Sequence, residues 1–249
     1  MNHYSISIVF PMFNERDYVK KTVSLATRTL DTITDDYEII IVDDASTDGC
    51  GEIADRMARE SSRIRVLHHK VNSKLGTTLR TGFACAKKEI VIYSDMDLPF
   101  DLEEIKRAMR IMEFTNCDIV TAYRHDRTSE GVLRTVYSAA YNILIRILFG
   151  VRIRDINFSF KLIKRQVLDS IELESNGSLI DAELIIRAIR AGYRVSQFGI
   201  DYFPRSRGTS TLSGPWVILA ILKEMIAFRL KLFRRSKVEP HSLHTLPPE

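Results

Sequence analysis

Apolar and polar positions in the first half of the chain form two kinds of segment. Short apolar runs rich in β-branched residues predict buried strands, and longer amphipathic stretches predict helices. The predicted strands cover residues 6–10, 38–42, 64–67, 90–93 and 118–122. The predicted helices cover residues 15–30, about 48–60 (with Thr47 or Asp48 as its cap), 77–87 and 102–114. Strands that alternate with helices predict an α/β fold, with a mostly parallel sheet and helices on both faces.

The second half of the chain shows a different pattern. It predicts an almost wholly apolar helix at 132–149, a strand turning helical at 158–167, a helix at 179–191 and a strand at 194–200. Residues 216–235 predict an amphipathic helix with Lys223, Lys231 and Arg234 on one face. Because this helix carries six charged residues, it is expected to lie in a membrane interface or pack on its own domain and not to span a membrane. Residues 236–249 are expected to be a flexible tail.

The composition fits one sizeable domain, or one domain plus a small appendage. Of the 249 residues, 45% are hydrophobic, which is enough to fill the core of an α/β domain. Cys50, Cys85 and Cys117 are scattered without metal-ligand spacing, so they are expected to be thiols in a reducing compartment. Residues 1–8 are polar and lead directly into a predicted strand, so no signal peptide is expected.

Charge is distributed unevenly along the chain. In residues 1–60 acidic side chains outnumber basic ones, whereas residues 124–165 hold nine Lys or Arg against three acidic residues. Residues 205–237 hold eight against Glu224 alone. A basic second half indicates an anionic partner, such as a phosphate, a membrane surface or nucleic acid. Nucleic acid is disfavoured because the basic segments lack interleaved aromatic residues and a known binding motif.

Two carboxylates follow the apolar run at 90–93. Asp95 and Asp97 come directly after it, and Pro99 then stops further strand pairing. Paired carboxylates suit a hard divalent cation, Mg²⁺ or Mn²⁺, which often bridges to phosphates. The alternative is a solvated turn before a helix, because Asp101 and Glu104 have the spacing of a capping box.

Polar residues also follow the first two predicted strands. Together with the Asp95 pair they make three clusters: Pro11 with Asn14 and Glu15; Asp43 and Asp44 with Asp48; and Asp95 with Asp97. The ends of parallel strands meet in one crevice, so the clusters are expected to share a site. The chain has no glycine-rich dinucleotide or P-loop motif, so this site is expected to bind a nucleotide through carboxylates and a metal. Asp43 or Asp44 is a candidate for base or ribose contacts. The alternative for Asp44 and Asp48 is a role in turns and helix caps.

Several motifs resemble those of a known enzyme family. Phe-Pro-Met-Phe-Asn-Glu at 10–15, Val-Asp-Asp-Ala-Ser-Thr-Asp-Gly at 42–49 and Ser-Asp-Met-Asp-Leu at 94–98 resemble family-2 glycosyltransferases with a GT-A fold. The segments at 155–161, 181–195 and 205–210 resemble the branch of dolichyl- or polyprenyl-phosphate sugar synthases. The resemblance covers roughly residues 5–233. It implies a single GT-A domain over 1–235, with a nucleotide-sugar half at 1–125, an acceptor half at 126–212 and an interfacial helix at 215–235.

The resemblance also implies an inverting transfer from a nucleotide sugar, GDP-mannose or a UDP-sugar, with Mg²⁺ or Mn²⁺ as cofactor. The candidate donor-binding residues are Pro11, Asn14, Glu15, Asp43, Asp44, Lys74 and Asp95. The candidate metal ligands are Asp95 and Asp97; where many relatives carry a further Gln ligand, this chain has Pro99. The candidate acceptor-binding residues are Arg124, Arg134, Ser138, Asp155, Ser159, Glu183, Arg205 and Ser210. Of all these, the residues implied in catalysis are Asp95, Asp97, Arg124, Arg134 and Arg205.

The expected function is transfer to polyprenyl or dolichyl phosphate by a peripheral protein on the cytoplasmic face of a membrane. A lipid phosphate is already anionic, so the reaction needs no general base. The runner-up acceptor is a saccharide hydroxyl in cell-surface polysaccharide synthesis, with Asp181, Glu183 or Asp155 as the base. A catalytically silent scaffold that binds a nucleotide sugar or a membrane is disfavoured, because Asp95 and Asp97 are both intact.

Overall fold

The computed structural model describes residues 4–126, 132–203 and 222–232. The chain divides into two compact units, Met1–Gly208 and Thr209–Glu249. The described part of the second unit is a helix at residues 222–232, within the predicted amphipathic helix. None of the helices in the described ranges is long and apolar enough to cross a membrane. The extension of one domain to residue 235 stays a prediction.

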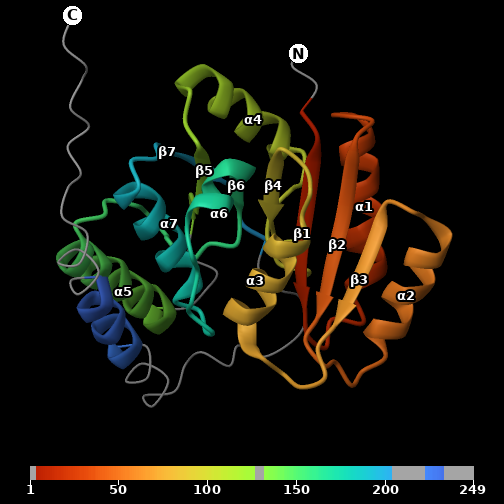
Figure 1. The fold of residues 1–249 in the computed structure, drawn as a ribbon, viewed down its shortest axis with the longest axis horizontal. Coiled ribbons are helices and arrows are strands. Elements are labelled where there is room, and N and C mark those ends of the chain that lie inside the picture. The colour runs from red at the N-terminus through yellow and green to blue at the C-terminus, as the bar shows by residue number, and fades with distance from the viewer. Residues whose placement is uncertain (1–3, 127–131, 204–221, 233–249) are drawn as a thin grey trace, which may run out of the picture. The chain divides into compact units, whose positions relative to one another are not determined.

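The first unit is built on a seven-stranded sheet (Figure 1). Its order is β3-β2-β1-β4-β6-β5-β7. The strands are β1 (Ile6–Met12), β2 (Tyr37–Asp43), β3 (Ile64–His68), β4 (Ile90–Tyr93), β5 (Ile119–Arg124), β6 (Lys161–Lys164) and β7 (Val195–Ile200). Strand β6 runs antiparallel to β4 and β5, and every other pairing is parallel. The predicted mostly parallel α/β sheet is therefore confirmed.

Helices cover both faces of this sheet. They are α1 (Val19–Asp31), α2 (Cys50–Glu60), α3 (Lys74–Cys85), α4 (Glu104–Thr115), α5 (Val132–Phe149), α6 (Arg165–Ser170) and α7 (Ile180–Arg190). Successive strand residues point to opposite faces. Val9 lies against Gly82 of α3, where an added Cβ would be 2.3 Å from the valine side chain. Its neighbours Ile8 and Phe10 instead share a buried cluster with Val23 of α1.

Four helix starts differ from the predictions, and one of them, that of α3, lies at Lys74, three residues before the predicted start. Helix α1 begins at Val19 because Glu15 is the start of a preceding turn, in which its carbonyl accepts the N–H of Val19. Helix α2 has Gly49, at φ 86°, as its N-cap, although the Asp48 carboxylate still accepts the first helical N–H at 3.0 Å. The predicted capping box is wrong, because α4 begins at Glu104 without a side-chain cap. Asp101 instead accepts the N–H of Glu103 at 3.0 Å.

Candidate active site

The carboxyl ends of β1, β2 and β4 lie at one edge of the sheet. Met12 pairs with Asp43 across β1 and β2, and Val9 pairs with Tyr93 across β1 and β4. The loops that carry the three predicted polar clusters therefore begin at the same edge, where ligands bind in open α/β sheets. Because β6 is antiparallel, its first residue, Lys161, lies opposite Tyr93. The segment before β6 consequently joins this edge too.

Backbone strain is concentrated in these edge loops. Among the described residues, six non-glycine residues have positive φ, and the sixth, Asn116, simply ends α4. The other five belong to the edge loops: Asn14 (56°), Ala45 (62°), Lys74 (69°), Leu98 (49°) and Asp155 (49°). Such conformations cost energy and persist where surrounding contacts impose them, often at functional sites.

Hydrogen bonds tie the loop after β1 to the loop after β2. The N–H of Asn14 donates to the Ser46 hydroxyl at 3.0 Å, and its side-chain oxygen accepts the N–H of Thr47 at 2.8 Å. The Asp48 carboxylate accepts the N–H of Arg16 at 2.9 Å. Asn14 and Asp48 therefore shape this edge; whether Asn14 also contacts a donor stays a prediction.

Asp43 is buried and fixed by contacts on both carboxylate oxygens. One oxygen accepts the N–H of Ser46 at 3.1 Å, and the other lies 2.9 Å from Nδ1 of His68. Nε2 of His68 lies 2.9 Å from the Asp55 carboxylate. The hydrogen bond with Asp55 is the main reason that the pKa of His68 is raised, and Asp43 adds to it.

Asp44 organises the loop after β3. It is buried, and its carboxylate lies 2.8 Å from Nδ1 of His69. It accepts the N–H groups of Ser73 at 2.7 Å and Lys74 at 2.9 Å. The predicted phosphate ligand Lys74 is thus held by its backbone while its side chain is exposed. Sequence reasoning missed both histidines, although a His-His pair at the end of a predicted strand was a visible signal.

The Asp95 and Asp97 pair leaves β4 beside a buried tyrosine. The hydroxyl of Tyr93 lies 3.5 Å from Oδ1 of Asp95. Burial raises the pKa of Tyr93 well above its ordinary value, and the charges of Asp181, Asp95 and Asp97 raise it further. The hydroxyl therefore stays protonated and can donate toward Asp95.

The donor set fits a hard divalent cation that is shared with a substrate. In the described ranges no group of three His, Cys, Asp or Glu side chains has a metal-binding arrangement. Asp95 and Asp97 provide two carboxylates, and Pro99 provides no side-chain ligand. Mg²⁺ commonly takes one or two protein carboxylates and completes its coordination with substrate phosphates and water. The pair therefore suits a metal that binds together with a nucleotide diphosphate.

A buried ion pair lies behind the carboxylates. Lys161 and Asp181 are both buried, and the Lys161 ammonium donates to the Asp181 carboxylate and, at 2.8 Å, to the carbonyl of Phe158. The same ammonium lies 5.4 Å from the ring centre of Tyr93. Burial raises the pKa of Asp181, while Lys161 lowers it and the nearby Asp155 raises it. Asp181, a candidate base, thus has a cation bound to it.

The other two candidate bases also have cationic partners. Asp155 forms a two-pronged ion pair with Arg124, with both Nε–Oδ2 and Nη2–Oδ1 at 2.7 Å. Glu183 is completely buried and accepts Nε of Arg187 at 2.7 Å. It also accepts the N–H of Ser175 at 2.7 Å, and so anchors the segment before α7.

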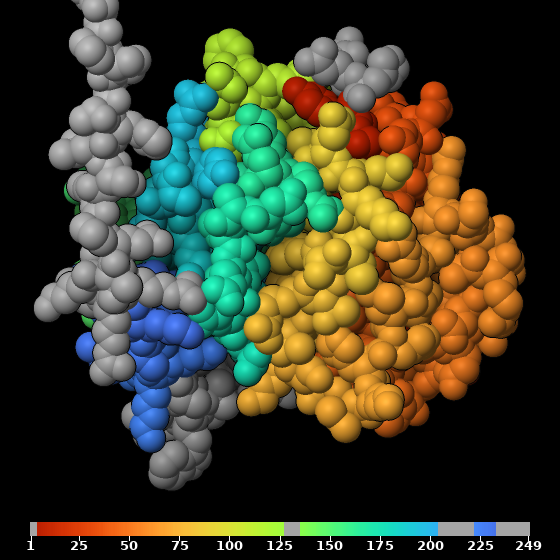
Figure 2. Space-filling model, viewed as in Figure 1, coloured from red at the N-terminus to blue at the C-terminus, as the bar shows by residue number. Residues whose placement is uncertain are grey.

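That segment bridges α3 and α7. The carbonyl of Asn176 accepts the N–H of Gly76 at 2.8 Å, and its side chain accepts Nη2 of Arg80 at 2.6 Å. A Cβ on Gly76 would lie 2.2 Å from the carbonyl oxygen of Ser175, so only glycine fits. Figure 2 shows the two parts of the chain in direct contact. Glu183, predicted to bind acceptor, therefore has a clear role in holding this bridge.

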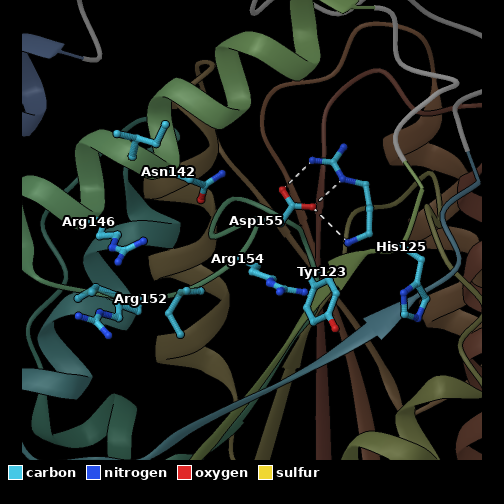
Figure 3. Close-up of a pocket in the computed structure, with 11 residues that line it drawn as sticks. Tyr123, His125, Asn142, Arg146, Arg152, Arg154 and Asp155 are labelled. Carbon is cyan, nitrogen blue, oxygen red and sulfur yellow. Dashed lines mark hydrogen bonds and ion pairs between the residues drawn. The ribbon is translucent and has the colours of Figure 1, made fainter.

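A cavity of about 590 Å³ opens at the end of β5, between α5 and the loop before β6 (Figure 3). Its lining residues are Tyr123, Arg124, His125, Asn142, Ile143, Arg146, Val151, Arg152, Ile153, Arg154 and Asp155. It is lined by four arginines against one carboxylate. The structure thus brings predicted acceptor residues Arg124 and Asp155 into one cavity. The sequence showed basic residues in this region but did not predict that Arg146, Arg152 and Arg154 share it.

The remaining predicted acceptor residues are placed only in part. Ser138 lies on α5, where its carbonyl accepts the side-chain amide of Asn142 at 2.8 Å. Ser159 is buried. The side chain of Arg134, and Arg205 and Ser210 altogether, lie outside the described residues.

Residues 7–172 match the family model described as glycosyl transferase family 2. The chain belongs to glycosyl transferase family 2. This family-2 glycosyltransferase is 32% identical over 207 residues to glycosyltransferase AglD of Haloferax volcanii, covering 80% of the chain but 33% of that relative. The chain therefore spans about a third of the length of AglD. It is 28% identical over 229 residues to polyprenol monophosphomannose synthase of Mycolicibacterium smegmatis, covering 87% of the chain and 84% of that relative.

Solved structures share the fold of this family-2 glycosyltransferase. Glucosyl-3-phosphoglycerate synthase from Mycobacterium tuberculosis, in complex with Mn²⁺ and uridine-diphosphate-glucose, superposes with a TM-score of 0.69 at 19% identity. The match covers 91% of this chain and 79% of that chain. The same enzyme with phosphoglyceric acid gives a TM-score of 0.62 at 20% identity, over 82% and 73% of the two chains. The predicted family and GT-A fold are confirmed.

Proposed function

We propose that this family-2 glycosyltransferase moves a hexose from a nucleotide sugar to polyprenyl or dolichyl phosphate, with inversion. The observation that carries the proposal is the arginine-rich cavity at the end of β5, on the same edge of the sheet as the Asp95–Asp97 loop. Asp155 connects the two. It lines the cavity, and its carbonyl accepts the N–H of Phe158, whose own carbonyl accepts the Lys161 ammonium beside the Tyr93 ring. A cavity with excess guanidinium groups suits an anionic acceptor. The relative named polyprenol monophosphomannose synthase supports a lipid phosphate as that acceptor.

The donor half would hold GDP-mannose or a UDP-sugar along the strand ends. The residues proposed to bind it are Pro11, Asn14, Glu15, Asp43, Asp44, Lys74 and Asp95. Asp95 and Asp97 would hold Mg²⁺ or Mn²⁺, which neutralises charge on the leaving diphosphate. The solved complex of a fold neighbour with Mn²⁺ and uridine-diphosphate-glucose supports this assignment.

The acceptor half would hold the lipid phosphate. Arg124 is already oriented by Asp155, and its planar fork presents donors in a fixed direction. Arg134, Ser138, Ser159, Arg205 and Ser210 complete the proposed acceptor set. A phosphate monoester attacks as an anion, so no residue has to remove a proton.

The same geometry argues against a saccharide hydroxyl as acceptor. That reaction needs a general base, and a carboxylate whose oxygens are occupied by a cationic donor is poorly placed to accept a proton. Asp155 is bound to Arg124, Asp181 to Lys161 and Glu183 to Arg187. These pairs support the lipid phosphate over the hydroxyl.

A lipid acceptor requires access to a membrane. We place the protein peripherally on the cytoplasmic face, where nucleotide sugars are made. Exposed apolar residues on α5, such as Ile143 and Ile147, support an interfacial position for that helix. The basic amphipathic helix at 215–235 would provide a second membrane contact.

A transfer assay tests the proposal. Labelled GDP-mannose and UDP-glucose are supplied with Mn²⁺ and one of three acceptors: polyprenyl phosphate, the matching polyprenol without phosphate, or a disaccharide. We expect an organic-extractable labelled product with polyprenyl phosphate only. Transfer to the disaccharide, with none to polyprenyl phosphate, would establish the hydroxyl reaction instead.

A further inference from the structure

Two arginines in the acceptor cavity have no role in the transfer proposed above. Arg146 comes from α5 and Arg152 from the loop that follows it, and both line the cavity. In the described part of the chain neither forms an ion pair, whereas Arg124 is bound to Asp155. Figure 3 shows Arg146 and Arg152 on one side of Asp155 and His125 on the other. Two guanidinium groups that face one cavity repel each other until an anion joins them.

The ligand of this pair must have an apolar part as well as a negative charge. Ile143 lines the cavity next to Arg146 and is 56% exposed. On the same face of α5, Val136 is 54% and Ile147 is 72% exposed, at helical spacings of seven and four residues. A ligand whose head lies between the arginines would have its tail along this apolar row. An amphiphile satisfies both surfaces, and a small phosphorylated metabolite satisfies only the cavity.

The reacting phosphate would occupy the other part of the cavity. It has to reach the sugar held at Asp95 and Asp97, and the contacts that connect the cavity to this pair run from Asp155 through Lys161 to Tyr93. That leaves Arg146 and Arg152 for a second anion. This step rests on the proposed function, which fixes where the first phosphate reacts.

We propose that Arg146 and Arg152 bind the phosphodiester head group of an anionic phospholipid, with its acyl chains along the Val136–Ile143–Ile147 row. Two guanidinium forks match the non-ester oxygens of a phosphodiester. The bound lipid would orient the mouth of the cavity toward the membrane in which the acceptor lies. The site therefore makes the enzyme selective for anionic membranes through a defined pocket and not only through overall charge.

Vesicle flotation with the full-length protein tests the site. The probes are phosphatidylcholine vesicles with and without phosphatidylglycerol. Arg146→Gln/Arg152→Gln should weaken binding to the phosphatidylglycerol vesicles at least about tenfold, the scale for two basic residues at an anionic surface. Arg56→Gln/Arg59→Gln on α2 makes the same change of charge and should weaken binding less than about threefold. Equal binding by the wild type and the Arg146/Arg152 variant would overturn the proposal.

Two further measurements distinguish binding in a defined pocket from attraction by overall positive charge. Arg146→Lys/Arg152→Lys keeps the charge but removes the two planar guanidinium groups, so binding to the phosphatidylglycerol vesicles should still fall several-fold. Full retention of binding would contradict a defined pocket. Inorganic phosphate, added against an equal ionic strength of chloride, should not release the wild type. Specific release would identify a free-phosphate site and overturn the lipid assignment.

The transfer assay keeps this inference separate from the proposed function. If wild-type protein transfers no sugar to polyprenyl phosphate but its flotation depends on Arg146 and Arg152, the function fails and the lipid site stands. If transfer succeeds and flotation is unchanged in the double variant, the lipid site fails and the function stands.

Discussion

The two sides of the candidate site handle charge in opposite ways. On the donor side the buried carboxylates Asp43 and Asp44 are surrounded by donors, which include two histidines and the backbone of the loops after β2 and β3. On the acceptor side one carboxylate, Asp155, serves a cavity lined by four arginines. The charges of Asp43 and Asp44 are balanced by donors within the chain, whereas the acceptor side carries positive charge that a ligand has to balance.

This difference indicates that the two sides suit different kinds of ligand. Under the proposed function, a nucleotide sugar brings many hydrogen-bonding groups, which a fixed array of polar atoms and strained loops would recognise with little reorganisation. A lipid phosphate brings mainly charge and an apolar tail, which excess arginines and an exposed apolar helix face can accept. The ion pair of Lys161 and Asp181 lies between the two arrangements.

Removal of that buried cation should have the largest effect. Lys161→Met leaves Asp181 buried without its partner, so the free energy of unfolding should fall by about 3–5 kcal/mol. Urea denaturation measures the loss. The matched control is Lys164→Met. Its partner Asp118 lies directly before β5, the Lys164 side chain is 26% exposed, and the substitution should cost less than about 1 kcal/mol. Similar losses of unfolding free energy in the two variants would show that the buried Lys161–Asp181 pair has no special energetic role between the two regions.

Neutralising the proposed metal ligand Asp97 should disrupt the donor side. Asp97→Asn replaces a charged ligand by a neutral amide, so kcat should fall at least about a hundredfold. Thermal unfolding of the variant without ligands should match that of the wild type. Asp101→Asn makes the same change four residues further on, where only a backbone N–H is bound, and should retain activity within about twofold. Full turnover by the Asp97 variant would exclude the metal role.

A charge-conserving change should perturb the acceptor side alone. Arg124→Lys loses the two-pronged contact with Asp155 and the directed donors of the guanidinium, so the KM for polyprenyl phosphate should rise about tenfold. The KM for the nucleotide sugar should stay within about twofold, because donor contacts lie elsewhere. Arg110→Lys on α4 is the control and should change neither constant. A parallel rise in both KM values would contradict the separation of the two sides.

The smallest predicted effect is a pH dependence of stability from the donor side. Asp55 and Asp43 raise the pKa of His68 in the folded protein. Because the pKa of His68 is higher in the folded than in the unfolded protein, its protonated form stabilises the fold. This stabilisation is complete below the unfolded-state pKa of about 6.5 and is lost as the pH rises through the folded-state pKa. The wild type should therefore lose stability relative to His68→Gln between about pH 6 and pH 8. The difference in urea midpoint between the two proteins measures this, and a constant difference would exclude the coupling.

Much of the donor side could be predicted from the sequence because its signals are local. The five strands predicted in the first half each end within two residues of β1 to β5, since short β-branched runs are strong signals. The positions of Asp43, Asp44, Asp95 and Asp97 at the sheet edge follow from those strands.

The acceptor side was less predictable because its contacts are non-local. Nothing within residues 158–167 shows that β6 pairs antiparallel with strands whose sequences lie some 40 to 70 residues earlier. The binding of Arg124 by Asp155, and the convergence of Arg146 and Arg152 on one cavity, depend on that pairing. The sequence revealed the charge of this region but not which charges neutralise one another.

The reversed direction of β6 has a consequence for how such enzymes diversify. Residues 125–160 leave the sheet at the end of β5 and return to it at the start of β6, so both ends of this excursion lie at the same edge. Lengthening or replacing the excursion need not shift the register of any strand. This segment can therefore be replaced without moving the sheet. Acceptor preference can then evolve within it, while the nucleotide-facing loops after β1 and β2 keep their geometry.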